Sequence, residues 1–131
     1  MTAQLVLIGG ACLILGLVAV LGGAPLTAWV LRRLDKAGGV GQGVRGVLAA
    51  AAVLKGGRTI GMLERAAVYG CVAGGWPEGI AVVVALKGLG RFAELRGPTE
   101  GTAERFLIGS FTSLLLAGAL GAVAHALVGF A

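Results

Sequence analysis

Charged side chains that stand beside apolar segments are the residues of this chain whose type and spacing could do chemistry. The candidates, which we call the charged layer, are Arg58, Glu64, Arg65, Lys87, Arg91, Glu104 and Arg105. Among the last six of these, four cations outnumber two carboxylates. A surplus of positive charge could hold an anion such as a lipid phosphate or a partner's carboxylate. The alternative is a set of ion pairs that only buttresses the helices.

Other arrangements that would indicate catalysis or metal binding are not found in the sequence. No serine, threonine or cysteine stands in a recognisable motif with a base, and no cluster has metal-ligand spacing. The glycine-rich segment 38–43 lacks the ending of a phosphate loop. Cys12, Cys71 and the single histidine, His125, lie in apolar runs, where we expect packing roles. We therefore expect a non-enzymatic protein with no cofactor and no metal.

The composition indicates what surrounds these charges. The 131 residues are 57% hydrophobic and 13% charged, with 25 glycines, whereas about a quarter of the residues in a soluble domain are charged. We expect one membrane domain over 1–131, in which small residues let helices approach closely. The net charge is +5, but all eleven Lys and Arg lie between Arg32 and Arg105 and alternate with apolar runs. That pattern indicates membrane topology and not nucleic-acid binding.

Two long apolar segments predict membrane-spanning helices over 5–31 and 104–130. The first has 27 residues, or about 40 Å of helix against roughly 30 Å of hydrocarbon, and we expect Pro25 to bend its last turns. A secretory signal is the competing interpretation, but no Lys or Arg precedes Arg32. Because basic residues follow this helix at once, we expect its end to be cytoplasmic and the N-terminus outside.

Two shorter segments, 59–75 and 77–92, meet at a Gly-Gly-Trp-Pro-Glu turn and predict a central hairpin. Their helices would measure about 26 and 24 Å, so crossing requires snorkelling side chains or a thinner bilayer. A re-entrant hairpin is the alternative. Full crossing is favoured because Trp76 and Glu78 resemble an interfacial anchor and a water-facing charge. Glu64 and Lys87 lie at similar distances from the turn, which predicts an ion pair between them.

Segment 42–55 is apolar over only nine residues, between Arg45 and Lys55, which is too short to cross a bilayer. Its helical spacing of apolar residues predicts an interfacial helix on the inner side, and a loose linker is the alternative. Small residues at regular spacing predict close helix packing. These are Gly57, Gly61, Gly70, Gly74, Gly109, Ser113, Ala117 and Gly121.

Three stretches also carry a resemblance, namely GRTIGMLER, ALKGLGRFAEL and ERFLIGSFTSLL in that order. The chain from 57 to 116 is similar to the C-terminal membrane half of an uncharacterised family of small bacterial multi-pass membrane proteins, with the pattern GRxIGxLER, AKxxxRF and ExxLIGxxxS. Leu86, Gly88 and Ser110 depart from that family, which has Ala, Ser and Thr at the matching positions. The resemblance implies a shared architecture in the bacterial inner membrane and transfers no activity. The family positions match Gly57, Arg58, Gly61, Glu64, Arg65, Lys87, Arg91, Phe92, Glu104, Gly109 and Ser113.

The expected fold class is an all-α integral membrane protein, a four-helix transmembrane bundle with a short central hairpin and an inner interfacial helix. Both termini are expected outside the cell membrane. Expected partners are the lipid bilayer, including anionic lipid, and further copies of the chain or another membrane protein. The expected function is that of an oligomeric scaffold or a subunit of a membrane complex. The alternative is an oligomeric channel or carrier whose charged layer binds an anion or anionic lipid on the cytoplasmic side.

Overall fold

The computed structural model describes residues 2–38, 57–90, 92 and 102–130, and its regular elements are all helices. They are α1 (Thr2–Gly38), α3 (Gly57–Ala73), α4 (Gly79–Gly90) and α6 (Thr102–Gly129). Within these ranges there is no strand, so the expected all-helical class is confirmed. The interfacial helix expected over 42–55 lies outside the described residues.

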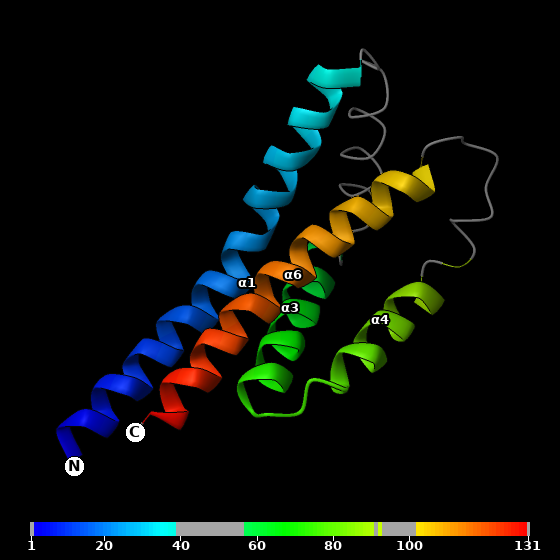
Figure 1. The fold of residues 1–131 in the computed structure, drawn as a ribbon. Coiled ribbons are helices and arrows are strands. Elements are labelled where there is room, and N and C mark those ends of the chain that lie inside the picture. The colour runs from blue at the N-terminus through cyan, green and yellow to red at the C-terminus, as the bar shows by residue number, and fades with distance from the viewer. Residues whose placement is uncertain (1, 39–56, 91, 93–101, 131) are drawn as a thin grey trace.

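Helix bounds differ from the expected ones mainly at α1 and α4. α1 continues through Pro25 and through the charged turn up to Gly38, because exposed arginine and lysine side chains such as Arg33 and Lys36 favour a helix. Figure 1 shows its axis changing direction about midway along its length, as expected where a proline removes a backbone hydrogen bond. α4 begins at Gly79 and not at Pro77, because Pro77 and Glu78 belong to the turn that starts it.

α1, α3 and α6 form a bundle, and α4 lies against the flank of this bundle (Figure 1). α1 and α6 run antiparallel and in contact, α3 packs against both, and α4 makes its main contacts with α3. The two chain ends and the α3–α4 turn lie at one end of the molecule. α1 ends and α6 begins toward the other end, whereas α3 begins partway between the two (Figure 1).

A small core lies where α1, α3 and α6 meet. Val68 is fully buried between Ala19 and Ala117, and Leu114 completes the cluster. Three of these four side chains belong to the neighbouring helices and two are alanines. The core is therefore built on close backbone approach rather than on large side chains, as is usual for helices packed in lipid.

The α3–α4 turn closes α3 with a Schellman motif. The Trp76 amide donates to the Cys71 carbonyl at 2.8 Å, and the Gly75 amide donates to the Val72 carbonyl at 3.0 Å. Gly75 has a φ of 76°, in the left-handed region that glycine adopts without strain. His125 of α6 reaches the same turn, where its Nδ1 donates to the Ala73 carbonyl at 3.1 Å.

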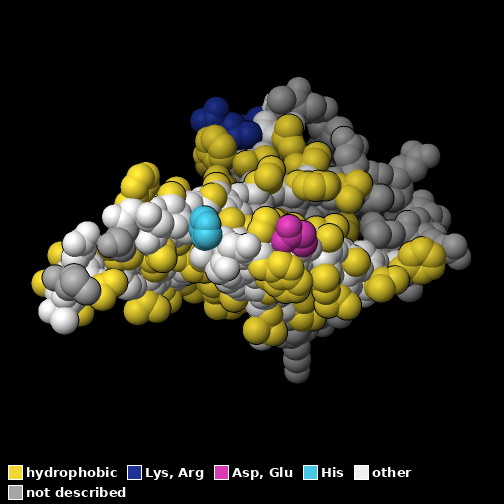
Figure 2. Space-filling view, turned by 60° about the horizontal axis from the view of Figure 1, so that its bottom comes forward, with side chains coloured by type: hydrophobic (Ala, Val, Ile, Leu, Met, Phe, Trp, Pro, Cys, Tyr) yellow, Lys and Arg dark blue, Asp and Glu magenta, His cyan; other side chains and the backbone are white. Residues whose placement is uncertain are grey.

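Two of the described helices are long and apolar enough to cross a membrane by length and composition. They are Thr2–Leu34, with a mean hydropathy of 2.7, and Phe106–Gly129, with 2.0. An N-terminal signal sequence or a soluble core helix can have a similar composition, but a core helix is mostly buried and only 6% and 22% of these two are. On the face shown in Figure 2, hydrophobic side chains are spread over the described surface and charged side chains are few. α4 is apolar but has 12 residues, and α3 carries three charges.

Candidate functional site

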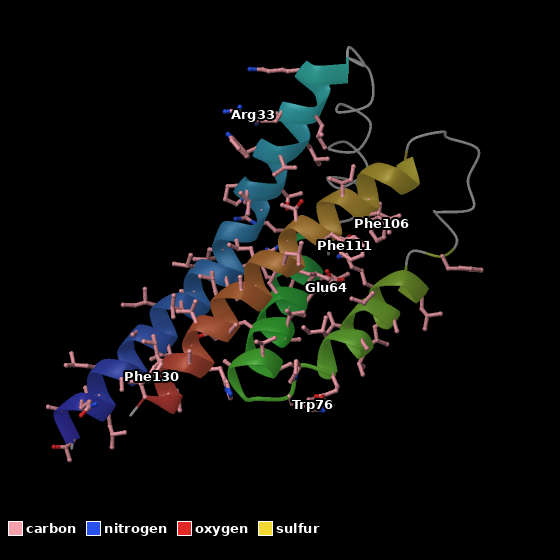
Figure 3. The ribbon with its side chains drawn as sticks, viewed as in Figure 1. Arg33, Glu64, Trp76, Phe106, Phe111 and Phe130 are labelled. Carbon is pink, nitrogen blue, oxygen red and sulfur yellow. The ribbon has the colours of Figure 1, made fainter. Side chains whose placement is uncertain are left out.

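Glu64 of α3 and Lys87 of α4 form an ion pair, as their distances from the turn predicted. The side chains are 13% and 19% exposed respectively, so the pair is shielded from solvent by its two helices. Lys87 Nζ also lies 5.6 Å from the ring centroid of Phe106 on α6, within the range of a cation–π contact. Figure 3 shows Glu64 between α3 and α4, with Phe106 nearby on α6. In the described part of the chain, this ion pair joins α4 to α3.

Arg65 takes no part in that pair and reaches into the α1–α6 interface instead. Its Nε donates to the Val20 carbonyl at 2.8 Å and its Nη1 donates to Ser113 Oγ at 3.1 Å. The side chain is only 6% exposed and has no carboxylate partner among the described residues. Gly23 makes this position possible, because an added Cβ there would overlap Arg65 Cδ and lie 2.8 Å from its Nε. A single arginine thus joins α3 to both long helices.

Arg65 lies near the middle of the bundle. It is the ninth of the 17 residues of α3, and its acceptor Val20 is the nineteenth of the 37 residues of α1. Along α1, Val20 is separated from Arg32 by 12 residues, or about 18 Å. The guanidinium therefore lies halfway along two helices. Two partly buried hydrogen-bond acceptors, the Val20 carbonyl and Ser113 Oγ, accommodate its charge.

The remaining members of the charged layer do not join this arrangement in the described part of the chain. Arg58 is exposed in the first turn of α3. Arg91 lies outside the described residues, as do the side chains of Glu104 and Arg105, whose backbone is in the first turn of α6. The structure therefore brings Glu64 and Lys87 together and directs Arg65 to another interface.

The stripe of small residues on α6 lies against α1 and α3, as its spacing predicted. An added Cβ at Gly109 would lie 3.2 Å from Thr27 Cγ2, and one at Gly121 would lie 2.9 Å from both the Tyr69 carbonyl oxygen and Val72 Cβ. Between them, Ser113 accepts from Arg65 and Ala117 is fully buried.

The small residues of α3 contribute less to packing than their spacing suggested. An added Cβ at Gly61 would lie 3.4 Å from Arg65 Nη1, whereas one at Gly70 would meet nothing within 4 Å. Gly74 is closest to the carbonyl of Gly70, one turn earlier in the chain. Gly57 starts the helix and is half-buried. The expectation that Gly70 mediates close packing is wrong within this chain, because the Gly70 side of α3 is exposed.

Two further packing residues were not singled out by the sequence. Tyr69 donates its hydroxyl to the Cys12 carbonyl at 2.6 Å, and its ring would lie 3.1 Å from a Cβ added at Gly16. At the start of α4, a Cβ added at Gly79 would overlap Cys71 Sγ. Gly16 and Gly23 are seven residues apart on α1, a two-turn spacing that could have marked the face on which α3 packs.

No protein-family model, curated protein or solved structure matches this chain. The resemblance to the family of small bacterial membrane proteins stays a prediction.

Proposed function

We propose that this chain is a non-enzymatic multi-pass protein of the bacterial inner membrane, and that it works as an oligomeric scaffold or as a subunit of a membrane complex. In this proposal α1, α3, α4 and α6 cross the bilayer, with both termini and the α3–α4 turn outside. The proposal is supported by the exposure of the apolar side chains. Only five hydrophobic side chains are buried in the described part of the chain, which is too few for a soluble domain of this size.

The outer face of α4 is the observation that favours assembly with another copy. α4 turns Ile80, Val83 and Lys87 toward α3. At 100° per residue, Ala85 lies almost directly opposite, with Leu89 and Val82 on one side of it and Ala81 and Gly88 on the other. Both alanines are exposed, and an added Cβ at Gly88 would meet nothing within 4 Å. Small residues on a membrane helix permit close approach of a second helix, and no helix in the described part of the chain covers that face.

Disulfide cross-linking through α4 tests the proposed assembly. In a Cys12→Ala/Cys71→Ala background reconstituted into lipid, Ala85→Cys should cross-link two chains under mild oxidation. A matched Leu13→Cys variant places the thiol on the exposed face of α1 and should cross-link poorly. Native mass spectrometry of the parent in mild detergent should show an oligomer. A monomer at every concentration, with nothing copurified and no preference for Ala85→Cys, would reject the proposal.

A second candidate function is an anion channel or carrier, and the charge near the middle of the bundle favours it. Glu64, Lys87 and Arg65 sum to +1, and the carboxylate is already engaged by Lys87. If Arg32 marks the inner membrane surface, Arg65 lies about 18 Å below it and so near the middle of a bilayer roughly 30 Å thick. Ionisable groups at that depth commonly mark ion or substrate pathways.

Anion flux in liposomes separates this candidate from the scaffold. A channel or carrier should show flux that changes by tenfold or so when Glu64→Gln raises the local positive charge, and that falls with Lys87→Met. The exposed Arg58→Gln variant serves as the control and should leave flux unchanged. Flux that is absent in the parent, or that is identical in all variants, would exclude the second candidate and leave the scaffold.

A further inference from the structure

We infer that the basic end of α1 is a binding site for the headgroup of an anionic phospholipid. The inference goes beyond the charged layer and rests on the proposed insertion of α1 in the membrane. Trp29, Arg32, Arg33 and Lys36 line an open hollow of about 450 Å³ at this end of the helix. All four side chains are exposed. They recur at intervals of three and four residues and therefore share one face of α1.

The geometry of the hollow suits a phosphodiester. Arginine presents paired N–H donors that match phosphate oxygens, and lysine adds a compact charge. Arg33 lies with its Cζ 4.7 Å from the centroid of the Trp29 ring, so the aromatic ring holds one guanidinium in place by a cation–π contact. Figure 3 shows Arg33 extending from α1 on the side away from α3, α4 and α6. The segment 32–36 also contains Asp35, so its three basic residues and one acid give it a net charge of +2.

The face of α1 that leads to the hollow indicates a lipid and not a free phosphate ion. Ile14, Val18 and Leu21 are 63%, 48% and 56% exposed. Pro25 and Trp29 continue this helix face, because the residues of the stripe from Ile14 to Trp29 follow one another at intervals of three or four. An acyl chain lying along this apolar stripe would place its headgroup at the hollow. Tryptophan at this junction is typical of the membrane interface, where each nearby Lys or Arg strengthens binding of anionic lipid about fivefold.

Quenching of Trp29 by brominated lipids tests the site. The protein has two tryptophans, so a Trp76→Phe variant reports on Trp29 alone. In mixed vesicles of phosphatidylcholine and phosphatidylglycerol, acyl-brominated phosphatidylglycerol should quench Trp29 more strongly than acyl-brominated phosphatidylcholine at the same mole fraction. Arg32→Gln/Lys36→Gln should reduce that selectivity by up to about 25-fold, as two fivefold losses, and it retains the stacking of Arg33 on Trp29.

Two controls and a competition complete the experiment. Arg58→Gln removes an exposed cation outside the hollow and should leave the selectivity unchanged. A Trp29→Phe variant reports on Trp76, at the other end of the molecule, and should show no selectivity. Inorganic phosphate should reduce the selectivity of Trp29 no more than sodium chloride does at equal ionic strength.

The possible results of the quenching experiment separate the headgroup site from the membrane insertion of α1. Strong but equal quenching by the two brominated lipids, or selectivity that survives in the Arg32→Gln/Lys36→Gln variant, would overturn the headgroup site while leaving insertion intact. Loss of selectivity with inorganic phosphate alone would assign the hollow to free phosphate instead. Absence of quenching by either brominated lipid would show that α1 lies outside the bilayer, and the proposed function would fail together with this inference.

Discussion

Replacing Gly121 with alanine should loosen the contact between α3 and α6. The added Cβ would lie 2.9 Å from the Tyr69 carbonyl oxygen and 2.9 Å from Val72 Cβ. Neither atom can rotate away, because one belongs to the backbone and the other is fixed to it. The two helices must therefore separate locally. Overpacking of this kind costs up to about 3 kcal/mol, and alanine returns about 1 kcal/mol of helix propensity, so we expect a net loss of about 1–2 kcal/mol.

Three other glycines provide a graded set of controls for this substitution. Gly70→Ala meets no atom within 4 Å and Gly118→Ala meets Val68 Cγ1 only at 3.9 Å, so helix propensity should stabilise both by up to about 1 kcal/mol. Gly109→Ala would lie 3.2 Å from Thr27 Cγ2, a methyl group that can shift by a few tenths of an ångström. Its effect should fall between those of the other variants.

The free energy of unfolding in bicelles, followed by helical circular dichroism during titration with sodium dodecyl sulfate, measures this order. Gly70→Ala and Gly118→Ala should be at least as stable as the parent, Gly109→Ala slightly less stable and Gly121→Ala the least stable. If Gly121→Ala matched the parent while Gly70→Ala lost stability, the packing of α6 on α3 described above would be wrong. The span of about 2 kcal/mol expected between the extremes is large enough to resolve.

Five further substitutions test the polar contacts and the α3–α4 turn with the same assay. Glu64→Gln and Lys87→Met should each lower the free energy of unfolding by about 3 kcal/mol, because each leaves a partly buried charge unpaired. The double variant should lose much less than the sum of the two. Additive losses would argue against the ion pair. Arg65→Met should be at least as stable as the parent. Ser113→Ala removes an acceptor from a buried cation and should lose about 1.5–3 kcal/mol of stability. The reverse order would contradict the buried position of the guanidinium. Gly75→Ala should cost about 1–2 kcal/mol from its positive φ, and a variant as stable as the parent would be inconsistent with the Schellman turn.

Residue spacing was enough to predict the central hairpin, the Glu64–Lys87 pair and the small-residue stripe of α6. Each depends on counting along a regular helix, either from a turn marked by Gly-Gly-Trp-Pro-Glu or along one face, and such counting needs no knowledge of neighbouring helices. Only the starts and ends of the helices required correction, because turn residues such as Pro77 and water-facing residues such as Lys36 obey local chemistry and not the apolar pattern.

The direction of Arg65 could not be predicted in the same way. Glu64 and Arg65 are adjacent, so their side chains leave α3 about 100° apart, and which helix each meets depends on where α1, α4 and α6 pack. The space for Arg65 comes from Gly23, 42 residues earlier in the chain. A single glycine that makes room for a distant side chain has no local signature; only the seven-residue spacing of Gly16 and Gly23 on α1 could have marked the face on which α3 packs.

Several contacts between the helices of this protein share one feature: a side-chain donor on one helix binds a backbone oxygen on another. They include Tyr69 to Cys12, Arg65 to Val20, Thr27 to Gly109 and His125 to Ala73. Every amino acid carries the accepting oxygen, so Cys12 and Val20 can change identity over evolutionary time without loss of the bond, provided that the helix persists. Tyr69 and Arg65 have no such freedom. Sequence change along α1 should therefore be tolerated at Cys12 and Val20 but not at Gly16 and Gly23, which leave room for the side chains of Tyr69 and Arg65.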